Sequence, residues 1–156
     1  MRQFFLILAL MCVSCSSALN FGKTKLWVST IRYSATDEAN GKTVIPFHVV
    51  LIYDEKNVEE FKKMSGDEFY KKILDRTAVG LERDYQNSLQ IFEFHVMPGS
   101  KLEQAPLKDK RSEVVLEGMV YAQYQGKTFK KPLLDSRGVE FQFNDKGVEL
   151  EAFDLG

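Results

Sequence analysis

Apolar and polar residues alternate with a period of two along several segments, as expected of β-strands with one buried face. The alternation is clearest in residues 27–33 and 139–143. Residues 44–53 are apolar at nearly every position, with Pro46 near the start, which is typical of a central strand buried on both faces. Further strands are predicted at residues 89–97, 114–124 and 148–153. The pattern predicts six or seven strands in all.

Between residues 54 and 80 the period changes to that of helices. Ser65 with Glu68, and Asn57 with Glu60, have the spacing of a capping box, so two helices are predicted. The apolar stripe of the second predicted helix consists of Phe69, Ile73, Leu74 and Thr77. The run Lys71-Lys72 is expected to face water.

Turn-forming residues separate these elements. Residues 35–43 contain Asp, Asn and Gly and are predicted to form an exposed loop, while Pro98-Gly99 and residues 144–147 predict turns. Gly118 within a predicted strand indicates a bulge or a close approach of another chain segment. The fold class is therefore predicted as mainly β, a β-sandwich with a small helical insertion after the second strand.

The N-terminal segment is predicted to be an export signal and not part of the fold. Arg2 precedes an apolar run at residues 4–13, which is about half the roughly 20 residues that a membrane-spanning helix needs. Small residues follow, and the segment 12–15 is similar to the cleavage site of bacterial lipoproteins, where a cysteine receives lipid through its sulfur. Cys12 stands where that pattern usually has Leu. We expect a lipoprotein-type signal peptide at residues 1–14, lipidation at Cys15, a tether at residues 15–23 and the sandwich domain at residues 24–156.

A second cleavage site is open to signal peptidase. Cleavage after Ala18, with Ser16 three positions before the bond, would give a soluble exported protein without cysteine. Cleavage before Cys15 leaves that residue as the only thiol, so neither product contains an internal disulfide. Several acyl chains on Cys15 would give stable anchoring. In some bacteria an acidic residue after the lipidated cysteine keeps such lipoproteins on the inner membrane, and Ser16 is not acidic, so the resemblance implies the outer membrane.

Charge and chemistry narrow the function further. The chain has 21 Lys and Arg against 22 Asp and Glu, with no localised basic patch, which argues against nucleic-acid binding. His48 and His95 lie in separate predicted strands with no cysteine or third histidine at metal-ligand spacing. No nucleophile elbow, phosphate-binding loop, dinucleotide fingerprint or EF-hand is present. We therefore predict no enzyme activity, no metal, no cofactor and no small-molecule substrate.

The order of features from residue 44 to residue 124 resembles the TssJ family, the outer-membrane lipoproteins of type VI secretion membrane complexes. The matching pieces are the strand that ends in Ile52-Tyr53, spaced phenylalanines at Phe61 and Phe69, and the strand that closes on residues 97–99. The strand at residues 118–122 and the final hairpin at residues 139–153 continue the match. Residues 123–125 depart from the family, which usually has aromatic and basic residues there.

The resemblance implies a transthyretin-like β-sandwich that hangs from the outer membrane on the periplasmic side. In the family, the loop between the first two strands makes much of the contact with the periplasmic domain of a large inner-membrane subunit, TssM. The matching loop is residues 35–43, and its polar candidates for partner binding are Asp37, Glu38 and Asn40. A loop held at its base by paired sheets is suited to such docking.

Two other classes of function remain open from the sequence. A periplasmic β-sandwich carrier would bind a small apolar ligand between its sheets and would need a cavity there, whereas the many phenylalanines suit a filled core. A hydrolase related to transthyretin-like enzymes would need His and Arg side chains that converge in a groove.

Overall fold

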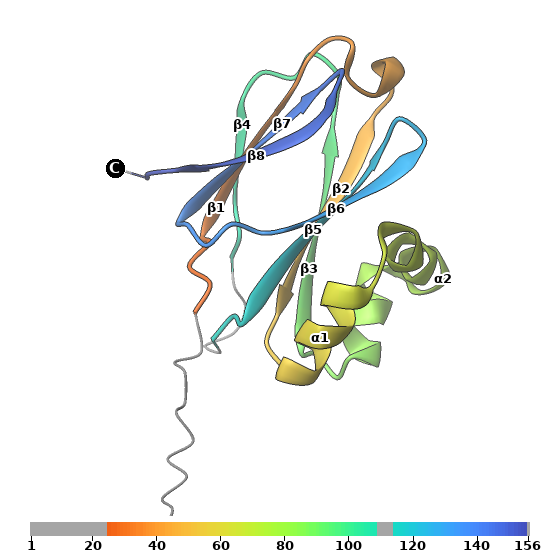
Figure 1. The fold of residues 1–156 in the computed structure, drawn as a ribbon, viewed down its shortest axis with the longest axis vertical. Coiled ribbons are helices and arrows are strands. Elements are labelled where there is room, and N and C mark those ends of the chain that lie inside the picture. The colour runs from red at the N-terminus through yellow and green to blue at the C-terminus, as the bar shows by residue number, and fades with distance from the viewer. Residues whose placement is uncertain (1–24, 109–113, 156) are drawn as a thin grey trace, which may run out of the picture.

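Two four-stranded β-sheets pack face to face, and two α-helices cover one of them, in a computed structural model that describes residues 25–108 and 114–155 (Figure 1). The first sheet has the strand order β4-β1-β7-β8 and the second β3-β2-β5-β6. Their bounds are β1 Thr30–Ala35, β2 Ile45–Ile52, β3 Leu89–Val96, β4 Glu103–Pro106, β5 Glu117–Tyr124, β6 Lys127–Pro132, β7 Gly138–Asn144 and β8 Gly147–Phe153. The helices are η1 Ala39–Lys42, α1 Glu55–Lys63 and α2 Gly66–Asp84.

The predicted fold class is confirmed. The fold is mainly β, and α1 and α2 lie between the second and third strands, as the sequence indicated. β1 and β7 pair in parallel, and the other strand pairs are antiparallel. The predicted signal peptide at residues 1–14, the tether at residues 15–23 and the lipidation site Cys15 lie outside the described residues.

Two hydrophobic cores share the central strand β2. Phe47, Val49 and Leu51 belong to the core between the sheets, whereas Val50 and Ile52 belong to the core under α1 and α2. Successive side chains of a strand point to opposite faces, so a strand that lies between the other sheet and the helices must be apolar throughout. This explains the uninterrupted apolar run that predicted a central strand.

Aromatic side chains fill the space between the sheets. The ring of Phe47 stacks on Phe94, with centroids 4.9 Å apart, and lies 5.3 Å from the ring of Phe141 and 5.4 Å from that of Phe143. Ring pairs at such distances add about 0.5–1.5 kcal/mol each beyond the burial of their surface. These four phenylalanines therefore act as core residues, as the sequence favoured.

The helix starts are partly as predicted. The Ser65 capping box is confirmed: Ser65 Oγ accepts a hydrogen bond from the Glu68 amide at 3.2 Å, and Glu68 Oε2 accepts one from the Ser65 amide at 2.7 Å. The predicted box at Asn57 is wrong, because α1 begins earlier, with Asp54 accepting a hydrogen bond from the Lys56 amide at 2.8 Å.

The predicted apolar stripe of α2 holds only in its first half. Phe69 is fully buried and Ile73 packs against the helix-covered core, but Leu74 is 81% exposed. Thr77 has φ 63° and ψ 163° and interrupts the helix, after which Leu81 returns to the core. A stripe extrapolated through a continuous helix therefore fails at Leu74 and Thr77.

Gly118 marks a close approach and not a bulge, because its pairing with Leu51 keeps the regular register of β5. A Cβ at Gly118 would lie 2.8 Å from Leu133 Cβ and 2.8 Å from Leu26 Cδ2. Leu26 thus packs directly on the backbone of β5.

Candidate docking surface

Four strand connections meet at one end of the sandwich. They are the β1–β2 loop, which includes η1, and the β3–β4, β5–β6 and β7–β8 turns. The pairings place them together, because Ala35 at the end of β1 lies beside Phe143, and Phe47 at the start of β2 lies between Phe94 and Ala122. The described chain begins at Lys25, at the opposite end (Figure 1).

The base of the β1–β2 loop is tied to its neighbours by backbone hydrogen bonds. The Thr36 carbonyl accepts from the Ala39 amide at 3.0 Å and from the Gly99 amide at 3.1 Å, and the Thr36 amide donates to the Phe143 carbonyl at 3.0 Å. The turn predicted at residues 98–99 is present, with Gly99 at φ 76°. The loop is therefore held by both sheets.

Asn40 is one of the predicted partner-binding residues, but most of its polar atoms form hydrogen bonds within the protein. Its backbone amide donates to the Tyr124 hydroxyl at 3.2 Å, and its Oδ1 accepts from the Gln125 amide. Its Nδ2 donates to Thr43 Oγ1 at 2.8 Å and to the Val44 carbonyl at 3.1 Å. With φ 50° it adopts the left-handed conformation that Asn tolerates. Asn40 thus joins the loop to the β5–β6 turn.

Asp37 and Glu38, the other two predicted partner-binding residues, are exposed at the outer side of the loop. Glu38 forms an ion pair with Lys42 at 3.1 Å, and each of these side chains is 68% exposed. An exposed pair of this kind is worth at most about 1 kcal/mol, so Glu38 can exchange Lys42 for another positive charge at little cost.

A surface groove continues from the loop toward α2. Its walls include Asn40, Thr43 and Val44, and Thr128 Oγ1 donates to Asp67 Oδ1 at 2.8 Å where β6 meets the start of α2. Val44 is 40% exposed beside this groove, and Met97 is 58% exposed in the neighbouring β3–β4 connection. The loop end therefore presents two acidic side chains together with apolar ones.

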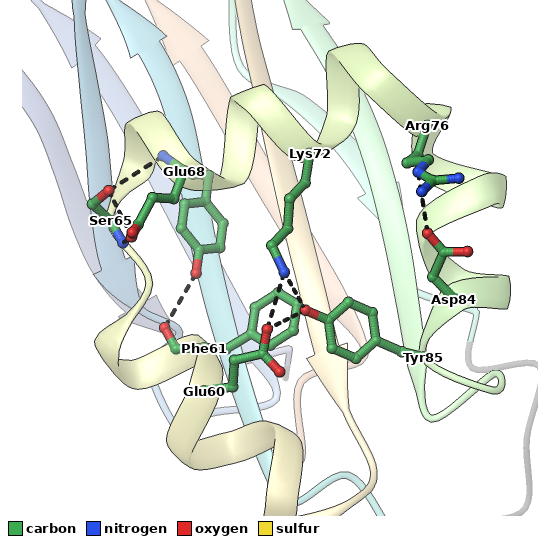
Figure 2. Close-up of polar contacts among 9 residues, drawn as sticks. Glu60, Phe61, Ser65, Glu68, Lys72, Arg76, Asp84 and Tyr85 are labelled. Carbon is green, nitrogen blue, oxygen red and sulfur yellow. Dashed lines mark hydrogen bonds and ion pairs between the residues drawn. The ribbon is translucent and has the colours of Figure 1, made fainter.

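A polar cluster that the sequence did not predict lies between the helices (Figure 2). Lys72 Nζ lies 3.0 Å from Glu60 Oε1 and 2.7 Å from the Tyr85 hydroxyl, which also donates to Glu60 Oε1. Lys72 therefore differs from the solvated residue that the sequence predicted, whereas Lys71 is exposed. The cluster joins α1, the first half of α2 and Tyr85, the residue that follows α2.

The cluster does not suit acid–base chemistry near neutral pH. Partial burial opposes ionisation of Glu60, but the hydrogen bonds from Tyr85 and Lys72 outweigh it and keep the pKa of Glu60 low. Burial and Glu60 raise the pKa of Tyr85, and the pKa of Lys72 is raised by Tyr85 and Glu60 despite its burial. All three groups therefore keep one protonation state around neutrality. Their hydrogen bonds persist there and hold the helices together.

The two histidines lie on one face of the second sheet but in different environments. His48 is buried under α2, with Nδ1 3.3 Å from the Tyr70 hydroxyl and no partner for Nε2, and burial lowers the pKa of His48. His95 is 57% exposed and its Nε2 lies 3.6 Å from Glu93 Oε1. Among residues 25–108 and 114–155 no group of three His, Cys, Asp or Glu side chains is placed to hold a metal ion. Neither helix of this described part is long and apolar enough to cross a bilayer.

The fold and these surfaces define a two-sheet β-sandwich with helices on one outer face and its strand connections gathered at one end. The structure is similar to that of Lip from Serratia marcescens, a membrane bound component of the Type VI Secretion System. The likeness has a TM-score of 0.53 at 17% sequence identity and covers 80% of this chain and 96% of that chain. It shows that the two proteins share a fold. No protein-family model and no curated protein sequence matches this chain.

Proposed function

We propose that this protein is an outer-membrane lipoprotein of a type VI secretion-like membrane complex, and that it docks the periplasmic domain of a large, TssM-like inner-membrane subunit. The observation that carries the proposal is the shared fold with Lip, over most of both chains. The lipoprotein-like signal ending at Cys15 adds to it from the sequence.

The arrangement of the two ends supports this role. The chain leaves the expected anchor and enters the sandwich at Lys25, whereas the β1–β2 loop, which is the proposed docking loop, lies at the far end (Figure 1). Strands of eight residues, such as β2, span about 26 Å at 3.3 Å per residue. The domain can therefore hold a membrane at one end and a protein at the other, which is a mechanical function that needs no catalytic residue.

The loop chemistry supports a protein partner. Asp37 and Glu38 offer exposed negative charge on a loop whose base is fixed, so little ordering entropy is lost on docking. Charges at such positions set orientation and association rate more than affinity. We expect a basic complementary patch on the partner.

The test is affinity purification from cell envelopes, with acylation scored by intact mass and co-purified inner-membrane subunits by proteomics. The wild-type protein is expected to carry lipid and to retain a large inner-membrane subunit. Cys15→Ser is expected to lose the lipid and its membrane retention, while its loop can still bind the isolated subunit.

Charge reversal separates the loop from the rest of the surface. Glu38→Lys is expected to weaken co-purification, whereas the matched reversal Glu151→Lys, on an exposed position of β8, should leave it unchanged. If both variants bind as the wild type does, the β1–β2 loop is not the contact. If the wild-type protein retains no inner-membrane subunit, the docking function is wrong.

A further inference from the structure

Large apolar side chains that are exposed in the described part of the chain gather in three places. One group flanks the docking loop, and a second, Leu74 with Val79, lies on either side of the break in α2. The third lies at the opposite end of the sandwich, where the chain enters, and includes Trp27, which is 58% exposed, and Val114, which is 41% exposed. This third group has no role in the proposed docking.

Trp27 projects from a backbone that is fixed in place. The preceding residue, Leu26, is buried and its amide donates to the Val115 carbonyl at 3.0 Å. The Trp27 amide donates to Asp135 Oδ1 at 3.3 Å. Lys25 Nζ lies 4.1 Å from the centroid of the Trp27 ring. A large aromatic ring and a stacked cation are thus presented outward together.

The chain before Trp27 is short and basic. Ten residue steps separate Cys15 from Lys25, so the tether spans at most about 35 Å when extended and about 17 Å as a coil. Lys23 and Lys25 are the charged residues between Cys15 and Trp27, and no acidic residue occurs before Asp37. The charge of this segment is complementary to that of anionic lipid headgroups.

Tryptophan and lysine share a physical preference for the boundary between lipid and water. The indole ring buries apolar area while its N–H remains near polar groups, and a lysine side chain can lie along an apolar surface with its ammonium in the headgroup layer. One lipid anchor fixes where a domain is but not how it is oriented. A second contact on the same end would fix the orientation.

We propose that Trp27 and Lys25 form a membrane-contact site that seats the tether end of the sandwich at the lipid–water interface. The site rests on the proposed function, because it requires that the chain before Lys25 be held to a membrane, as lipidation of Cys15 would do. With Trp27 in the interface, the docking loop points away from the bilayer and toward the partner. Val114 adds apolar area at the same end.

Trp27 is the one tryptophan of the chain, so its fluorescence reports directly on the site. The acylated full-length protein is reconstituted into vesicles of phosphatidylethanolamine and phosphatidylglycerol, with and without brominated acyl chains. We expect the emission to move to shorter wavelength on reconstitution and to be quenched by the bromolipid. The variant Lys25→Glu should reduce the quenching, and the reduction should be larger in these vesicles than in vesicles prepared without phosphatidylglycerol.

A matched control moves the probe to the other end. Met97 has the same exposure as Trp27, 58%, and lies in the β3–β4 connection beside the docking loop. The double variant Trp27→Phe/Met97→Trp should give an emission that the bromolipid does not quench. Equal quenching of both proteins would show that the domain has no preferred orientation, and an unquenched, water-exposed Trp27 in vesicle-bound protein would overturn the site.

Failure of the anchor can be told apart from failure of the site. If intact mass shows no acyl group, the protein is held to nickel-chelating lipids through a histidine tag placed before residue 16, and the same quenching is measured. Quenching there supports the contact even though lipidation has failed. If the Trp27 emission is instead shifted to shorter wavelength without lipid, and the shift grows with the fraction of dimer measured by sedimentation, a second copy of the protein occupies this surface. The membrane proposal is then wrong.

Discussion

Replacing Gly118 with alanine tests whether the close packing of β5 limits the stability of the sandwich. A Cβ at this position would meet Leu133 Cβ and Leu26 Cδ2 at 2.8 Å, and Leu133 Cδ2 at 2.9 Å. Overpacking of a well-packed core costs typically about 1–3 kcal/mol. Alanine recovers about 0.5–1 kcal/mol through its lower backbone entropy in the unfolded chain. We expect a net loss of about 1–2 kcal/mol in the free energy of unfolding.

The same substitution at Gly80 is the matched control. A Cβ there would lie 3.4 Å from Arg76 Cβ and 3.6 Å from Thr77 Oγ1, which are ordinary contacts. Gly80→Ala should therefore stabilise the protein by about 0.5–1 kcal/mol. Urea unfolding followed by circular dichroism measures both values. If Gly118→Ala is as stable as Gly80→Ala, the packing of Leu26 and Leu133 against β5 is not as close as described.

Three further predictions concern the polar groups. Burial, with a smaller contribution from His95, outweighs the effect of Glu93 and keeps the pKa of His48 below its ordinary 6.5 in the folded state. The stability that this neutral histidine allows above about pH 6.5 is therefore lost as the pH falls, and His48→Leu should flatten this pH dependence in urea titrations at several pH values. Tyr85→Phe removes two hydrogen bonds from a partly exposed cluster and should lower the free energy of unfolding by about 0.5–1 kcal/mol in the same assay. Asn40→Ala should lower the free energy of unfolding by about 1–2 kcal/mol, whereas Glu38→Lys should change it by no more than about 0.5 kcal/mol and should reduce partner co-purification. A large loss of stability in Glu38→Lys with none in Asn40→Ala would contradict the roles assigned to these loop residues.

The sequence predicted the strands with a distinct buried pattern and missed the two without one. β4 and β6 were not predicted because their side chains do not alternate clearly between buried and exposed. Glu103–Pro106 is mostly exposed, and Lys127–Pro132 has no fully buried residue. Both are edge strands of their sheets. An edge strand is held largely by backbone hydrogen bonds on one side, and Lys and Pro at such edges discourage pairing with other chains. Hydropathy alone carries little information about strands of this kind.

The break in α2 and the Glu60 cluster could not be predicted for a different reason. Thr77 has a positive φ, which costs a β-branched residue about 1–3 kcal/mol, and its Oγ1 accepts a hydrogen bond from the Gly80 amide at 3.4 Å, as the N-cap of a new helix start does. Arg76 and Asp84 form an ion pair across the break at 3.5 Å, and Leu81 gains a place in the core. The Arg76–Asp84 pair lies within α2, whereas the core that receives Leu81 contains residues of other elements, such as Val50 and Tyr121, which the local sequence does not reveal.

In the β1–β2 loop, the polarity and the position of the residues could be predicted from the sequence, but the different contacts that they make could not. Asp37, Glu38 and Asn40 have similar polarity in the sequence, and all three lie on the predicted loop. Asn40 pairs with Gln125, which is 85 residues away, so its role depends on the β5–β6 turn that only the folded sandwich brings near. Charge was the signal that indicated which loop residues are exposed, because ionised side chains that lack an internal partner stay in water.

The connection between the two ends of the domain is direct. β1 begins five residues after Lys25 and leads without interruption into the loop that starts at Thr36. It is paired on both sides, with β4 and with β7, and Ile31 is fully buried in the core between the sheets. A strand held along both edges and anchored in a close-packed core cannot slip without breaking many hydrogen bonds together. A load applied between Lys25 and the β1–β2 loop would therefore be shared by the whole first sheet, as the proposed link between a membrane and a protein partner requires.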